Sequence, residues 1–67
     1  MTNEEAKEAM QKQTPVVCDG IEYRRISAII YRYDHRGKLY ISAELLDKRA
    51  NSVTIALLKD VQAVKRE

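Results

Sequence analysis

The chain has 67 residues, 45% of them hydrophobic and 33% charged, and its 12 Lys and Arg against 10 Asp and Glu leave a net charge of +2. A chain of this length forms one small domain at most, and it contains no apolar stretch long enough to span a membrane. Its single Cys and single His exclude an internal disulfide and a zinc site made of the usual Cys and His ligands.

Residues 2–13 are predicted to form a helix. Thr2, followed three residues later by Glu5, fits a capping box, in which each side chain binds the other residue's backbone N–H. Pro15 disfavours helical geometry at the residue before it, so we expect the helix to end by about Gln13. The stripe available for docking on the rest of the domain is narrow and consists of Ala6, Ala9, Met10 and Gln13.

A tight hairpin is predicted next, because the hydrophobic period changes to two from Pro15 onward. Asp19-Gly20 separates the short extended runs 16–18 and 21–23. These two residues readily adopt the positive φ angles of a type I′ turn, which is the turn that joins two strands through two residues.

Residues 21–33 continue as one long extended run. Its apolar side chains change from odd to even positions near Arg24–Ile26. Such a change of face predicts a β-bulge or a sharp bend. A bend of this kind allows one strand to contribute to both halves of a small barrel.

A second hairpin turn is predicted at residues 34–37. It leads into a half-buried strand, whose inward residues are Leu39, Ile41, Ala43 and Leu45. A three-residue loop with Gly37 as a G1 bulge places Tyr31 opposite Ile41, whereas a four-residue loop places Tyr31 opposite Tyr40. We favour the first register, because Asp at the start and Gly at the end suit a type I turn followed by a bulge.

The remainder of the chain is predicted to form two further strands. A polar turn at 47–52 precedes a strand at 53–57, whose inward face is expected to be Val53, Ile55 and Leu57. A short 3₁₀ turn at 58–60 then leads to a closing strand at 61–64. Residues 65–67 are expected to form a frayed tail.

This order of elements resembles an SH3-like five-stranded barrel over residues 15–64. A helix before five bent strands is also similar to the Sm-like fold, a relative of that barrel, but the second Sm motif is not recognisable in 53–64. The string from Asp19 to Asp47 resembles small uncharacterised phage and mobile-element proteins, a resemblance that implies no activity. We expect a single domain over 1–67 that is mainly β with one N-terminal helix, either as an SH3-like barrel or as a strongly bent antiparallel sheet.

The low net charge conceals a basic segment that also carries tyrosines. Residues 24–38 hold five Lys and Arg against one acid, Asp34, which gives +4. Arg and Lys neutralise phosphates and Tyr stacks on bases, a combination by which small barrels bind single strands. Alternatively, Arg32 pairs with Tyr40 across the hairpin while Tyr31 and Tyr33 lie in the core. The candidate interaction surface comprises Arg24, Arg25, Tyr31, Arg32, Tyr33, Arg36, Lys38 and Tyr40.

Neither a catalytic site nor a cofactor site is expected. We interpret Cys18 as a core or edge residue and His35 as a solvated turn residue, and two glycines are too few for a phosphate-binding loop. We expect no cofactor, metal, membrane or small-molecule substrate. With no secretory signal, the chain is expected to be cytoplasmic. Its expected function is that of a non-enzymatic protein-interaction or regulatory module that binds a protein partner or self-associates, and the alternative is a weak nucleic-acid-binding domain.

Overall fold

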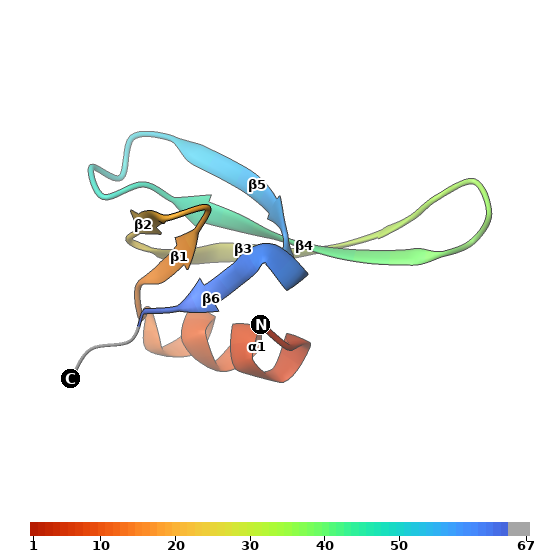
Figure 1. The fold of residues 1–67 in the computed structure, drawn as a ribbon, viewed down its shortest axis with the longest axis horizontal. Coiled ribbons are helices and arrows are strands. Elements are labelled where there is room, and N and C mark those ends of the chain that lie inside the picture. Colours follow the sequence, from red (N-terminus) through yellow and green to blue (C-terminus); the bar gives the residue numbers. More distant parts are fainter. Residues whose placement is uncertain (65–67) are drawn as a thin grey trace.

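One helix and six strands make up residues 1–64, the part of the chain that the computed structural model describes (Figure 1). This arrangement confirms a mainly β fold with one N-terminal helix. The expected frayed tail at 65–67 lies outside the described residues. The elements are α1 (Asn3–Lys12), β1 (Val16–Cys18), β2 (Ile21–Tyr23), β3 (Arg25–Tyr33), β4 (Leu39–Leu46), β5 (Val53–Leu57), the 3₁₀ turn η1 (Leu58–Asp60) and β6 (Val61–Ala63).

The strands form two antiparallel three-stranded sheets, in the orders β2-β1-β6 and β3-β4-β5. Neither sheet closes into a barrel. Six strands replace the expected five because the long run 21–33 divides at Arg24 into β2 and β3, which belong to different sheets. The predicted change of face is confirmed, since the chain bends at Arg24 and the β3–β4 register shifts between Ile26 and Ala28.

Helix α1 begins with the capping box that the sequence predicts. The Thr2 hydroxyl accepts a hydrogen bond from the Glu5 backbone N–H at 3.1 Å, and the Glu5 carboxylate accepts one from the Thr2 N–H at 2.8 Å. The helix ends where Gln13 adopts a left-handed conformation with a φ of 55°. Ala6 and Ala9 are buried and Met10 packs against the core, so these three residues of the predicted stripe dock the helix on the sheets, whereas Gln13 is exposed (Figure 1).

Both predicted hairpin turns are present. Asp19 and Gly20 have φ angles of 52° and 76°, as a type I′ turn requires. In the β3–β4 hairpin the Gly37 N–H donates to the Asp34 carbonyl at 3.0 Å, and Gly37 has a φ of 80°. Tyr31 therefore lies opposite Ile41, which confirms the register of the three-residue loop.

The inward face predicted for β5 is wrong. Val53, Ile55 and Leu57 are 50%, 48% and 37% exposed, whereas Ala56 packs against the core. The pairing with β4 explains this result, because Ala56 lies opposite the fully buried Ala43. Residues directly opposite each other share a face of the sheet, so the larger apolar side chains of β5 must point outward.

The core lies between the two sheets and the helix, and it is small. Its largest fully buried side chains are those of Val16, Ile26, Leu45 and Val61. Each contributes about 1.5–3 kcal/mol when it is removed from water. A domain of roughly this size buries only about 60% of the surface of its unfolded chain, so its stability is modest and depends on local features such as caps.

Replacing Thr2 with Ala should lower the free energy of unfolding by about 1 kcal/mol, because the N–H of Glu5 loses its acceptor. Chemical denaturation monitored by circular dichroism would measure the change. Thr14→Ala is the matched control, since Thr14 is an exposed threonine just beyond the same helix. Equal midpoints for the two variants would show that the cap contributes nothing to stability.

Candidate interaction surfaces

The tyrosines of the β3–β4 hairpin are exposed rather than buried. Tyr31, Tyr33 and Tyr40 are 49%, 70% and 39% exposed. The alternative in which Tyr31 and Tyr33 lie in the core is therefore wrong. All three rings are accessible for stacking or for contact with a protein.

These side chains are distributed over both faces of the hairpin. Tyr31 and Tyr33 share one face, on which the Tyr31 hydroxyl donates to the Asn3 side-chain carbonyl at 2.9 Å. Arg32 and Tyr40 lie opposite each other on the other face. The Lys38 ammonium lies over the Tyr40 ring, 5.6 Å from the ring centroid.

The eight candidate residues do not form one surface. Arg25 pairs with Leu46 at one end of β3 and Tyr33 with Leu39 at the other, eight residues away, which is about 26 Å along an extended strand. The Arg25 guanidinium instead donates to the Gln13 side chain at 3.3 Å. Arg24 lies next to it, exposed at the bend. The structure thus separates Arg24 and Arg25 from the group that contains Tyr31, Arg32, Tyr33, Arg36, Lys38 and Tyr40.

A second surface is the outer face of the β3-β4-β5 sheet. The strand registers align Ile30, Ser42 and Leu57 in one row across the sheet, and Glu44 with Ile55 in the next. Ser42 is 7% exposed because its larger apolar neighbours flank it. We use "outer face" for the apolar side chains gathered here, which are Ile30, Tyr40, Val53, Ile55 and Leu57.

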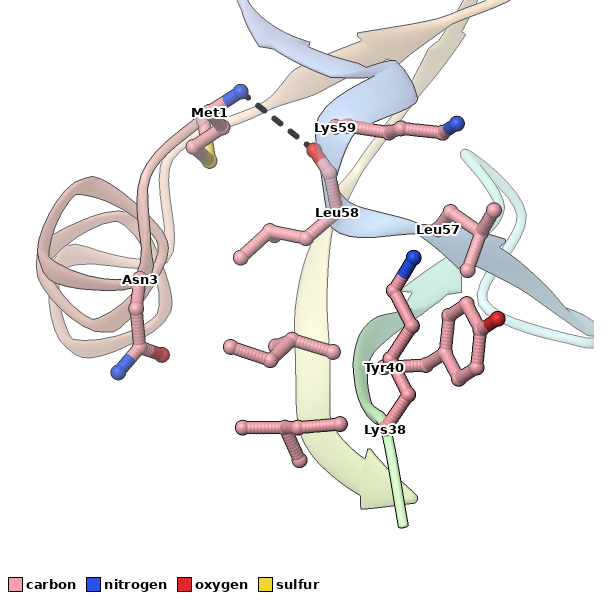
Figure 2. Close-up of a pocket in the computed structure, with 9 residues that line it drawn as sticks. Met1, Asn3, Lys38, Tyr40, Leu57, Leu58 and Lys59 are labelled. Atoms are coloured by element: carbon pink, nitrogen blue, oxygen red, sulfur yellow. Dashed lines mark hydrogen bonds between the residues drawn. The ribbon is translucent and has the colours of Figure 1, made fainter. Parts of the chain in front are cut away.

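A cleft of about 390 Å³ lies beside the part of β4 that follows the hairpin turn (Figure 2). Figure 2 shows Met1 and Asn3 on one side of it and Lys38, Tyr40 and Leu57 on the other. The Met1 amino group donates to the carbonyls of Leu58, at 3.4 Å, and Val61, at 3.0 Å. The lining residues are Met1, Asn3, Lys38, Leu39, Tyr40, Ile41, Leu57, Leu58 and Lys59.

Cys18 and His35 do not come together. Cys18 is buried in β1, whereas His35 is exposed in the turn that joins β3 to β4. Figure 1 shows this hairpin extending away from β1. Burial raises the pKa of the Cys18 thiol, and the negative charges of Asp19 and Asp60 raise it further. A nucleophilic cysteine needs the opposite shift and a base within reach, so these two residues do not form a catalytic pair.

Within residues 1–64, no group of three or more His, Cys, Asp or Glu side chains is placed to hold a metal ion. In the same part of the chain, no helix has the length and apolar character needed to cross a membrane.

No family model, curated protein or solved structure matches this chain.

The outer face and the cleft were not predicted from the sequence. The outer face could have been found by pairing Ala43 with Ala56, since two small residues opposite each other suit a crowded interior. The cleft depends on where β5 leaves the sheet after Leu57, and residue types alone do not specify that point.

The Cys18 thiol should react with Ellman's reagent at least about tenfold more slowly in the native chain than in the unfolded chain. Its 6% exposure and its raised pKa both lower the amount of accessible thiolate near pH 7. Absorbance of the released thiolate gives the rate, and a Thr14→Cys, Cys18→Ser chain supplies the exposed-thiol reference. A native Cys18 as fast as this reference would contradict the burial of β1.

Proposed function

We propose that the chain is a non-enzymatic protein-interaction module that self-associates through β5 and the outer face. The observation that carries the proposal is the exposure of Val53, Ile55 and Leu57, three large apolar side chains on one strand at the edge of a sheet. Monomeric proteins seldom leave such a contiguous apolar surface in water.

The edge of β5 supports this proposal. Among the described strands, β5 pairs with β4 alone, so its other edge presents free backbone donors and acceptors. Proteins usually protect such an edge with Lys, Pro or a bulge. The sequence of β5 is Val-Thr-Ile-Ala-Leu, which has no charge, no Pro and no Gly.

The composition of β5 suits pairing with a second copy of itself. In an antiparallel pair centred on Ile55, Val53 of one copy lies opposite Leu57 of the other, and the two Ile55 side chains meet. Apolar cross-strand pairs of this kind stabilise a sheet by about 0.2–1 kcal/mol each. Because the edge is uncharged, the two copies do not repel each other there.

The surface area that an interface must bury is compatible with a weak dimer of this chain. A standard protein interface buries about 800 Å² per partner, roughly a sixth of the 5035 Å² accessible surface of the described chain. A five-residue strand edge is too small to supply this area alone. The outer face must therefore be covered as well, and we expect dissociation constants in about the micromolar range.

We also propose an SH3-like architecture, and the strand order supports it. When β2 and β3 are taken as the two halves of one bent strand, the order becomes β6-β1-β2/β3-β4-β5, with a 3₁₀ turn before the last strand.

The cytoplasm is the compartment we propose, because the one cysteine is a buried free thiol.

Ile55→Lys should weaken self-association at least about tenfold, because it places a charge at the centre of the proposed pairing. Sedimentation velocity over a range of protein concentrations gives the dissociation constant. Ile21→Lys is the matched control, since Ile21 is 57% exposed and lies on the other sheet. A wild-type chain that is strictly monomeric at millimolar concentration, or equal weakening by both variants, would refute the proposal.

Nucleic-acid binding is a second candidate, favoured by the 70% exposure of Tyr33 near Arg32, Arg36 and Lys38. If three cations contact phosphates, affinity for a labelled oligothymidine should fall roughly 20-fold between 50 and 200 mM salt. Fluorescence anisotropy measures this change.

Tyr33→Ala should weaken binding by about 1–3 kcal/mol, whereas Tyr33→Phe, which keeps the ring, should not. Equal affinities for the two variants would exclude stacking on Tyr33.

A further inference from the structure

The cleft runs along the edge of β4 rather than across one face of the sheet. Four consecutive residues, Lys38 to Ile41, line it. Successive side chains of a strand point to opposite faces, so a cavity that touches four in a row must lie beside the strand. Leu57, Leu58 and Lys59, at the point where the chain leaves the sheet, also line the cleft.

This edge of β4 is open because β5 is shorter than the strand it pairs with. The β4–β5 register extends from Leu46 opposite Val53 to Ser42 opposite Leu57, and the chain then turns into η1. The β4 residues beyond Ser42, which are Leu39 to Ile41, pair with β3 only.

Along the open edge, backbone groups of β4 are directed away from β3. The Lys38 carbonyl accepts a hydrogen bond from the Asp34 N–H at 3.0 Å and so points toward β3. Hydrogen-bonding direction alternates along a strand, so the N–H and C=O of the next residue, Leu39, point away from β3. They are available to an extended chain lying where β5 would continue.

The charge and polarity of the lining define the chemistry of the occupant. Lys38 and Lys59 both line the cleft, and no acidic side chain is among the described lining residues. Leu39, Ile41 and Leu58 supply apolar surface between them. The volume of about 390 Å³ lies within the range of about 300–1,000 Å³ typical of ligand sites.

We propose that the cleft binds an extended acidic segment of a protein partner, which adds a short strand to β4 at Leu39–Ile41 and places carboxylates near Lys38 and Lys59. The backbone of the segment pairs with the open edge, as in other cases of strand addition. Three residues of β4 span about 10 Å, so the core of the segment is three or four residues long. This binding uses the edge of β4 and not the free edge of β5, and the cleft shares only Tyr40 and Leu57 with the outer face.

The test uses the full chain labelled with ¹⁵N and a blocked peptide, acetyl-Val-Glu-Val-Asp-Val-amide. Titration followed by amide chemical shifts should give saturable changes at residues 38–41 and 57–59. A peptide of the same length with Lys in place of Glu and Asp should bind at least about tenfold more weakly. The acidic peptide with an N-methyl group on its central valine should also lose binding, because its charges remain but a backbone donor is removed.

Variants of the chain provide the complementary test. Lys38→Glu with Lys59→Glu should weaken binding of the acidic peptide at least about tenfold, whereas Lys7→Glu with Lys48→Glu, which changes the net charge equally at exposed sites elsewhere, should not. The Ile55→Lys chain should bind the peptide as the wild type does, even if its self-association is lost.

Four results would overturn the proposal: no shifts at 38–41 with millimolar acidic peptide, shifts confined to β5, equal binding of the N-methylated peptide, or equal weakening by the two double variants. The first two concern the place of binding, and the last two concern strand addition and charge. Because Ile55→Lys tests self-association separately, failure of one proposal leaves the other unaffected.

Discussion

The whole arrangement depends on how one long extended run changes direction twice. Residues 21–33 bend at Arg24 and shift register between Ile26 and Ala28. Each irregularity restores an inward direction to an apolar side chain, so that Tyr23 and Ile29 pack against the core cluster to which the buried Ile26 belongs. A regular strand would send alternate members of this set into water. The bend thus divides the run between two sheets and places the core between them.

The β4–β5 register is the second constraint, and it links the two candidate surfaces. Placing Ala56 opposite Ala43 allows close packing inside, and it turns Val53, Ile55 and Leu57 outward. Leu58, the next residue, is 4% exposed and begins the 3₁₀ turn η1, where the chain leaves the sheet. This departure ends β5 at Leu57 and leaves the rest of β4 without a neighbour on that side.

Local rules made most of the fold predictable from the sequence. The Thr2 capping box, the Asp19-Gly20 turn and the Gly37 bulge each depend on residues within a few positions of one another, and all three are present. The inward face of β5 was predicted wrongly because it depends on cross-strand pairing. Ala56 lies opposite Ala43 on the inward face, so the three larger apolar residues of β5 lie on the other face. The candidate site was only partly predictable, because distance along β3 separates Arg24 and Arg25 from the tyrosines.

The pairing of β1 with β6 has a consequence for the order in which the molecule folds. Val16 lies opposite Ala63, so this ladder joins positions 47 residues apart, whereas the β1–β2 and β3–β4 hairpins join near neighbours. Closing a long loop costs more chain entropy than closing a short one. We therefore expect the two hairpins to form before the β1–β6 ladder closes. Until that ladder closes, Val16 has a partner strand on one side only, which is β2.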